Sequence, residues 1–368
     1  MNNESLLEEI RRAAELSPEE RRANEYNELI KDFVIDDNVE YPDPEYLIEI
    51  GGVPTMPKGN LVALSAKWKN GKTFFCDILT AIYLGSDQFA NCRSCSAEGR
   101  VLFFDTEQAK SDTARIRKII KAMTPEQRHN DFRVVCLREA AIDTDMDQSA
   151  TVSRFELIKR AIDHEHPDLV IIDGIADLIY NYNDVIESQS IVNELAAVAN
   201  KHNCCIVVVM HQNKGQKDKN MKGHLGTMLF QKCSDVFNVE KCGSVFVASH
   251  AVSRHRNCED ICFKLDANAV PMDAVADRQL QVEMERQQDK AKFHEQISCC
   301  FGDATTALMR SDIVKKIKEN LGYANRKSYE MFNQAVTLGI LKTNDKRHYS
   351  LVPLQAGGTR ATQHPDND

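Results

Sequence analysis

Residues 59–76 read Gly59-Asn-Leu-Val-Ala-Leu-Ser-Ala66-Lys-Trp-Lys-Asn-Gly71-Lys72-Thr73-Phe-Phe-Cys76, an apolar run followed by a polar turn that ends in Gly-Lys-Thr. The pattern predicts a strand, a loop and a helix. The backbone N–H groups of such a loop and the N-terminus of the next helix bind phosphate, a lysine adds positive charge, and the hydroxyl of Thr73 can ligate Mg²⁺. The predicted phosphate-binding residues are Ala66, Lys67, Lys69, Asn70, Gly71, Lys72, Thr73 and Phe74.

One position departs from the usual loop. The pattern has glycine six residues before the lysine, and this chain has Ala66. Alanine can serve there if its φ stays negative, whereas Gly71 is where close approach of the backbone to phosphate most needs a missing side chain. Taken alone, the stretch leaves a chance Gly-Lys-Thr in an ordinary strand, turn and helix as the alternative.

Two further apolar runs end in acids. Residues 168–173, Asp-Leu-Val-Ile-Ile-Asp173, are typical of a buried parallel strand, and Arg100-Val-Leu-Phe-Phe-Asp105-Thr-Glu107 is a second such strand. Parallel strands end at one edge of a sheet, so Asp173 can support Mg²⁺ there and Glu107 can polarise an attacking water. The alternatives are a solvated strand end for Asp173 and a helix-capping acid for Glu107.

The order of these motifs resembles a known family. Gly-Lys-Thr, Phe-Phe-Asp-Thr-Glu-Gln-Ala, Ile-Ile-Asp-Gly and Val-Val-Val-Met-His211-Gln212-Asn follow one another as in the RecA-type ATPase core. The resemblance covers residues 50–267 and is nearest to the RepA and DnaB-like branch of hexameric helicases and to ATPases of mobile elements.

That resemblance implies ATP and Mg²⁺ as cofactors. It implies phosphate and metal binding by Lys72, Thr73 and Asp173, and water activation by Glu107. It also implies that Gln212 senses the γ-phosphate, a role that the preceding histidine could share. From the residues alone, the alternative is that Gln212, at the tip of a predicted strand, is an ordinary amide at the start of a loop.

Two basic segments further along resemble functional parts of the same family. Lys222-Gly-His224-Leu-Gly-Thr is predicted to be a polar, glycine-hinged loop, similar to the segment that faces the central channel and touches DNA; a plain surface loop is the alternative. Arg254-His-Arg256 resembles the basic pair that acts on the neighbouring subunit's γ-phosphate, which implies a catalytic arginine in trans. A solvated basic hairpin or a nucleic-acid contact is the alternative reading of this pair.

Composition agrees with a large α/β core. The chain has 368 residues, of which 42% are hydrophobic. Strands expected near residues 60, 101, 133, 169 and 205 alternate with helices, which predicts a mostly parallel sheet covered on both faces, with an antiparallel side near 235, 245 and 261. No apolar run reaches the length of a membrane span, and the N-terminus is acidic, so we expect a cytoplasmic protein without a membrane partner.

The first segment, residues 1–49, is predicted to be an acidic helical arm and linker. Residues 1–50 carry fifteen Asp or Glu against five Lys or Arg. Ser5 and Ser17 each begin a sequence typical of a capped helix, and Tyr41-Pro-Asp-Pro is typical of a linker. The arm could pack on a neighbouring subunit, and a mobile tail is the alternative.

After a core predicted to span residues 50–288, the C-terminal segment has the opposite charge. Residues 310–349 carry nine Lys or Arg against four acids, in a pattern of helix, turn, helix (326–341) and two-stranded wing. This resembles a winged helix-turn-helix module over residues 289–354, followed by a tail, 355–368, expected to be disordered. The resemblance sets four basic side chains, together with Tyr329, against DNA phosphates, and a protein-docking module is the alternative. The four are Arg326, Lys327, Lys346 and Arg347.

Twelve cysteines are scattered along the chain, and buried reduced thiols account for most of them. The exception is Cys92-Arg-Ser-Cys95, expected in a loop before a strand. A zinc site that adds Cys258 and Cys262 is an alternative, although four-ligand sites normally come from two well-formed knuckles.

These features together predict a Mg²⁺-dependent ATPase that acts on DNA. We expect a ring of identical subunits, a hexamer by resemblance, that works as a helicase or translocase with other proteins in replication or mobilisation of a plasmid or mobile element. The main alternative is a nucleotide-gated DNA-binding regulator or helicase loader. A third interpretation, a degraded core that binds but does not hydrolyse ATP, rests only on Ala66.

Overall fold

The computed structural model describes residues 17–31, 33–141, 150–215, 218–254, 256–302, 307–343 and 345–353. The chain divides into two compact units, Met1–Glu45 and Tyr46–Asp368. In the first unit, α2 spans Pro18–Ile30 and begins with the predicted cap: the Ser17 side chain accepts from the backbone of Glu20, whose carboxylate accepts from the backbone N–H of Ser17. None of the residues of α2 is buried. The helix predicted from Ser5 lies outside the described residues.

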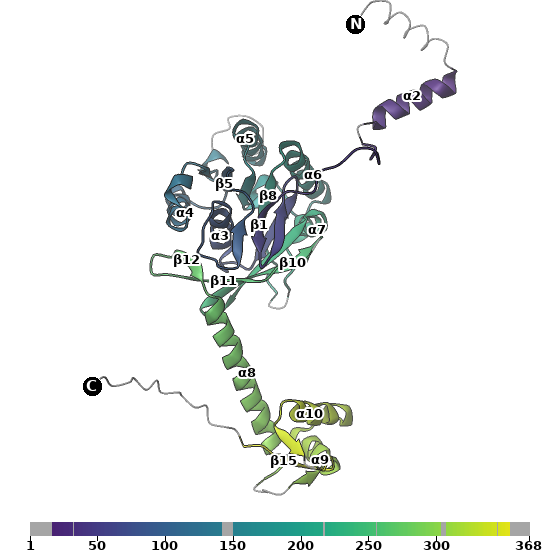
Figure 1. The fold of residues 1–368 in the computed structure, drawn as a ribbon, viewed down its shortest axis with the longest axis vertical. Helices are drawn as coiled ribbons and strands as arrows, with labels where there is room; N and C mark the ends of the chain where they lie inside the picture. Colours follow the sequence, from purple (N-terminus) through teal and green to yellow (C-terminus); the bar gives the residue numbers. More distant parts are fainter. Residues whose placement is uncertain are drawn as a thin grey trace, which may run out of the picture. The chain divides into compact units, whose positions relative to one another are not determined.

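The second unit is built on a large sheet (Figure 1). Nine strands form it in the described residues, in the spatial order β12-β11-β10-β9-β3-β8-β7-β5-β6. Their bounds are Leu61–Ala66 (β3), Val101–Asp105 (β5), Phe132–Cys136 (β6), Leu169–Asp173 (β7), Cys205–His211 (β8), Asp235–Cys242 (β9), Val245–Ser253 (β10), Ile261–Leu265 (β11) and Pro271–Asp273 (β12). The strands from β9 through β3 to β6 are parallel, and β10, β11 and β12 extend the β9 side in antiparallel pairs. The predicted α/β class with a mostly parallel sheet is confirmed.

Helices cover both faces of this sheet (Figure 1). Alternate residues of each strand face opposite sides, so Val62 and Leu64 belong to one apolar core and Leu61 and Ala63 to the other. The first core contains α3 (Lys72–Tyr83) and α4 (Lys110–Met123), and the second contains α5 (Ala150–Glu165), α6 (Val185–His202) and α7 (Gly223–Lys232). Short 3₁₀ helices span Glu126–Arg128, Glu139–Ala141 and Ile175–Leu178 (η3). The parallel strands are buried on both faces, as their continuous apolar runs predicted.

The sequence did not reveal a small sheet formed by two strands before the phosphate loop and one strand after α3. This sheet contains β1 (Tyr46–Ile50), β2 (Val53–Pro57) and β4 (Cys92–Ser94), in the order β2-β1-β4. The loop prediction for Cys92 was therefore wrong, because Cys92 pairs with Ile50 in this sheet. Cys92 is buried and Cys95 is exposed, and in the described residues no cluster of three or more His, Cys, Asp or Glu side chains could hold a metal ion.

The C-terminal part begins with the long helix α8 (Val275–Ser298), so the boundary predicted after residue 288 lies inside this helix. It continues with β13 (Leu308–Met309), α9 (Arg310–Leu321), α10 (Asn325–Thr337), β14 (Leu341–Thr343) and β15 (His348–Leu351), and the strands form a sheet in the order β13-β15-β14. The prediction that the second helix reaches Leu341 was wrong: α10 ends at Thr337, Gly339 has a φ of 67°, and Leu341 starts β14. None of the described helices is both long and apolar enough to cross a membrane.

Candidate nucleotide-binding site

The loop between β3 and α3 has the backbone of a phosphate cradle. Ala66 is the last residue of β3 and pairs with His211 and Val239, so it keeps the extended backbone that an alanine needs there. Gly71 caps α3 with a φ of 82°, and no side chain caps the first turn. A side chain on Gly71 would also meet the ring of Phe246 at 2.9 Å. The first N–H groups of α3 are thus left to a ligand, as an anion site requires.

The three predicted segments converge at one edge of the sheet. Asp173, at the end of β7, accepts a hydrogen bond of 2.6 Å from the hydroxyl of Thr73. Asp105 at the end of β5 stands in register with Asp173, and Glu107 follows it by two residues. The geometric requirement on which the sequence interpretation rests, a single rim for all three segments, is therefore met.

A histidine joins the lysine to the glutamate. His211, the last residue of β8, places Nδ1 3.1 Å from Nζ of Lys72 and Nε2 3.4 Å from Oε1 of Glu107. An ammonium group can only donate, so Nδ1 accepts from Lys72 and Nε2 carries the proton that faces Glu107. His211 thereby fixes the ammonium group of Lys72 and the carboxylate of Glu107 relative to each other.

Local charges set the protonation of these groups. Burial lowers the pKa of Lys72, while the carboxylates of Asp173 and Glu107 raise it. The hydrogen bond from His211 lowers the pKa of Glu107, so this carboxylate is ionised at neutral pH and can orient a water. Burial raises the pKa of Asp173 to about 6, against the opposing effect of the Thr73 hydrogen bond.

The donor set fits Mg²⁺ and a triphosphate. The Thr73 hydroxyl and the Asp173 carboxylate are adjacent oxygen ligands of the kind that Mg²⁺ prefers, and a divalent cation would favour the ionised form of Asp173. Bound Mg²⁺ would neutralise charge on the phosphates. Lys72 and the N-terminus of α3 would hold the phosphates themselves.

A cavity of about 400 Å³ opens beside these groups. Its wall includes Lys69 to Phe74, Glu107, Asp173 and His211, and also seven residues that were not predicted: Trp68, Asp77, Gln108, Asp112, Arg115, Ile116 and Ile119. Four of the seven lie on α4 at positions 112, 115, 116 and 119, the spacing of a single helix face. That spacing is a signal that could have placed them in the site.

Gln212 does not line this cavity, contrary to its predicted role at the γ-phosphate. Its amide is 6% exposed and donates to the hydroxyl of Ser65 at 3.1 Å, on the side of β3 that faces Asn238. Successive residues at the end of β8 point in opposite directions, so only one of the two can face the phosphates. Of the two residues, His211 lines the cavity. Ala66 and Lys67 are also absent from the wall, which begins at Trp68.

The family described as AAA domain matches residues 23–217, more than half of the chain. The chain belongs to the AAA domain family. This membership supports ATP binding by the P-loop and nucleotide hydrolysis. No curated protein matches the sequence. The crystal structure of the RadB recombinase is similar with a TM-score of 0.42 and 17% sequence identity, over 60% of this chain and 93% of that chain.

The two candidate arginines lie away from the P-loop of their own AAA domain. β10 runs antiparallel to β9, and its end, Ser253, pairs with Asp235 at the beginning of β9. Arg254 follows at that edge, opposite the phosphate cradle, where its guanidinium donates to the carbonyl of Lys232 at 2.7 Å. Arg254 and Arg256 are both exposed. Neither arginine lines the cavity of this chain.

The prediction of a loop around Lys222 and His224 was wrong, because α7 begins at Gly223. Leu225 and Leu229 have helical spacing and are both buried against the sheet, and this apolar pattern outweighs the tendency of the two glycines to form a loop. Lys222 stands at the cap of this helix with Nζ 4.6 Å from the centre of the Tyr182 ring, and His224 is exposed. Both therefore lie near the phosphate edge of the sheet.

In the C-terminal part, all four predicted basic side chains are exposed. Arg326 and Lys327 lie in the first turn of α10, where Glu330 pairs with them at 3.1 and 3.7 Å. Lys346 and Arg347 lie in the turn between β14 and β15.

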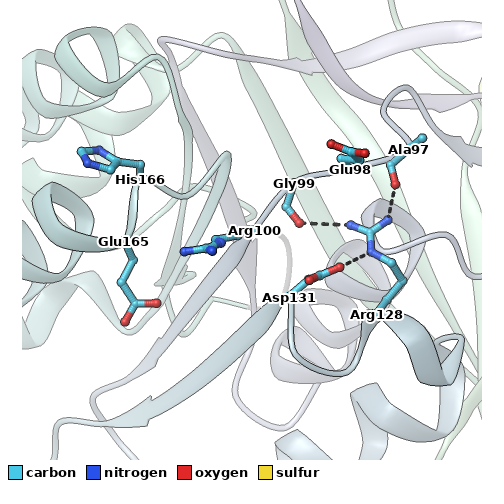
Figure 2. A pocket seen from close by; sticks show the side chains of 8 residues that line it. All are labelled: Ala97, Glu98, Gly99, Arg100, Arg128, Asp131, Glu165 and His166. Carbon is cyan, nitrogen blue, oxygen red and sulfur yellow. Dashed lines mark hydrogen bonds and ion pairs between the residues drawn. The ribbon is translucent and has the colours of Figure 1, made fainter.

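A second cavity, of about 540 Å³, lies at the amino ends of β5 and β6 (Figure 2). Arg128 is one of the polar residues that line this cavity. Its guanidinium pairs with Asp131 and donates to the carbonyls of Ala97 and Gly99 at 2.8 and 3.0 Å. Glu165 and His166 lie on the other side of the cavity. It contains none of the predicted site residues, so its greater volume does not make it the nucleotide site.

Replacing Glu107 by glutamine is expected to lower the rate of nucleotide hydrolysis by about 100-fold or more, because an amide cannot accept the proton of an attacking water. Nucleotide affinity should change little, since the lysine and the P-loop remain. Single-turnover hydrolysis gives the rate. Fluorescence of Trp68, the single tryptophan of the chain and part of the cavity wall, gives the affinity. Glu126→Gln, an exposed change on another helix, is the control; an unchanged rate in Glu107→Gln would contradict the assignment.

Proposed function

We propose that the chain is a Mg²⁺-dependent ATPase that acts on DNA as a ring-forming helicase or translocase, in replication or mobilisation of a plasmid or mobile element. One observation carries the proposal: Lys72, Thr73, Glu107, Asp173 and His211 meet around one cavity at the carboxyl edge of the sheet. Electrostatic stabilisation and positioning are what phosphoryl transfer asks of a protein.

A surface beside that cavity favours single-stranded DNA as the partner. Tyr180 is 71% exposed in the segment after η3, and Tyr182 in the same segment packs under Lys222. The carbonyl of Tyr182 accepts from the N–H of Leu225 at 3.0 Å, so the segments that follow β7 and β8 lie side by side. The exposed ring of Tyr180 suits base stacking, and Lys222, which lies over Tyr182 in the same segment, suits phosphate contact along one strand.

The alternative, a regulator or loader that binds duplex DNA, draws support from the C-terminal part. Its two helices and hairpin expose the basic groups of α10 and of the β14–β15 turn, and Tyr329 is 47% exposed on the same helix. A winged helix-turn-helix would use these groups on DNA phosphates. Glu330 offsets part of that charge, which weakens the case for α10 as the main DNA contact.

Two tyrosine variants separate these functions. Tyr180→Ala is expected to weaken binding of labelled single-stranded DNA by about tenfold, through loss of a stacked base, while Tyr329→Ala leaves that affinity unchanged. Fluorescence anisotropy with single-stranded and duplex DNA measures both variants. The reverse pattern, with duplex binding lost in Tyr329→Ala alone, would favour the regulator. Hydrolysis that rises with single-stranded DNA, with strand displacement, would add support for the motor, and light scattering with ATP and DNA tests the ring.

A further inference from the structure

Asp77, in the second turn of α3, is a buried carboxyl group without a partner. It is 0% exposed, and among the described residues neither of its carboxylate oxygens has a hydrogen-bond partner. The hydroxyl of Thr80, three residues further along the helix, is likewise buried and unpaired. Buried polar groups are normally satisfied, so two such groups on one helix face require an explanation.

The packing of the fold does not explain why position 77 has a carboxyl group. Burial, and then the charges of Asp173 and Asp105, raise the pKa of Asp77 well above its ordinary value. A small apolar residue at this position would avoid the cost of desolvation and complete the core around Phe75 and Ile78. The residue therefore acts against the stability of the free protein, which is the pattern expected of a group kept for a ligand.

The position of Asp77 indicates which ligand. It belongs to the wall of the nucleotide cavity, five residues beyond Lys72 and so about 7.5 Å further along the helix axis. Apolar side chains form part of the same wall: Phe74 packs against Ile119, and Ile116 lies one turn before Ile119 on α4, although Gln108, Asp112 and Arg115 also line the cavity. Apolar wall residues beside one buried, unpaired hydrogen-bonding group suit a flat heteroaromatic ring that carries an N–H donor.

A second cation is the other ligand that a carboxylate could take, and the surroundings disfavour it. The nearest acids are committed elsewhere, since Asp173 accepts from Thr73 and Asp105 accepts from Thr113 at 2.7 Å. Within the described residues, no group of three or more His, Cys, Asp or Glu side chains has an arrangement that could hold a metal ion. Apolar walls also cannot replace the water ligands of Mg²⁺.

We propose that Asp77 is the base-reading residue of the nucleotide site and accepts a hydrogen bond from the exocyclic amino group of a purine base held between α3 and α4. The inference rests on the proposed nucleotide function and deepens it. Adenine carries this amino group at position 6 and guanine at position 2, so the same chemistry can come from ATP or GTP. A base without the amino group would leave the carboxyl unpaired, which is how a buried polar group rejects an analogue.

The test compares nucleotides that differ by one amino group. Binding is followed by Trp68 fluorescence in the Glu107→Gln background, so that hydrolysis does not intervene. ATP is paired with purine riboside triphosphate, which lacks the 6-amino group, and GTP with ITP, which lacks the 2-amino group. We expect one pair to differ by about tenfold or more with Asp77 present, and by less than about twofold after Asp77→Leu. The pair that responds identifies the base.

A second measurement covers the case in which the variant folds poorly. Without nucleotide, the midpoint of thermal unfolding of Asp77→Leu should equal or exceed that of the unaltered chain; a fall of several degrees would show a structural role and overturn the proposal. Equal affinities within both pairs when Asp77 is present would also overturn it, without the use of any variant. If instead Lys72→Ala binds nucleotide as well as the unaltered chain, the nucleotide site itself is wrong.

Discussion

Replacing Lys72 by alanine is expected to lower kcat/KM for nucleotide hydrolysis by about 10⁴-fold, through weaker binding and a slower chemical step. The side chain is 8% exposed and lies in the cavity wall among Glu107, Asp173 and His211. Without the ammonium group, the carboxylates of Glu107 and Asp173 would lose the cation that lies among them, and the phosphates would lose its charge. Phosphate release measures the rate, and Trp68 fluorescence measures the binding.

The control for Lys72→Ala is Lys118→Ala. Lys118 is an exposed lysine of α4 that is not part of the cavity wall, so its removal alters the net charge equally and should leave both quantities unchanged. Equal rates of hydrolysis in Lys72→Ala and the unaltered chain would rule out the assigned site. Nucleotide binding without any hydrolysis by the unaltered chain would instead favour the interpretation of a degraded core, which drew its support from Ala66.

Sequence reasoning worked best where a residue's role follows from its place at a strand end. Asp173 and Glu107 follow buried apolar runs, and the carboxyl ends of parallel strands meet at one edge whatever the details of packing. The same logic predicted the strand that ends at His211. It did not decide between His211 and its neighbour Gln212, because adjacent residues differ only in the face toward which they point, and that face depends on the register of β8 against β3.

Sequence reasoning did not predict the cavity residues that lie on the sides of helices. Asp77 and Ile116 are thirty-nine positions apart in sequence and meet in one cavity wall through the packing of α3 on α4. Periodicity shows that each helix has an apolar face, and does not show which partner that face meets. An acid inside an otherwise apolar helical run was nevertheless visible in the sequence at Asp77, and such a break in pattern is where a functional residue is expected.

The segment at Lys222 shows the opposite error. Two glycines in six residues predicted a hinge, but Gly226 sits inside α7 because its missing side chain admits the backbone of Met221, which an added Cβ would meet at 2.5 Å. Gly223 has a φ of 71° at the start of the same helix, where a side chain would meet Tyr182. Both glycines are needed because other segments pack closely against them, and the sequence does not show which segments these are.

Mixing two variants that are each inactive is expected to restore hydrolysis. If the arginine that completes the site comes from the neighbouring subunit, either Arg254→Ala or Arg256→Ala should lower kcat by about 10³–10⁵-fold. Arg254 lies at the edge of the sheet opposite the P-loop, so it cannot contact the nucleotide bound to its own subunit. Co-assembled with Lys72→Ala subunits, an Arg254→Ala or Arg256→Ala subunit supplies its intact lysine to a site that receives the arginine from the other variant.

The size of the recovery follows from the symmetry of a head-to-tail ring. With equal amounts of the two variants, roughly a quarter of the sites contain both an intact lysine and an intact neighbouring arginine. Lys72→Ala mixed with Glu107→Gln is the control, because both changes fall in the same half of the site and no combination of subunits repairs it. Recovery above this control identifies the arginine that acts in trans. A mixture of Lys72→Ala with either arginine variant that stays at the control level would contradict an arginine shared between subunits and, with it, most of the case for a motor.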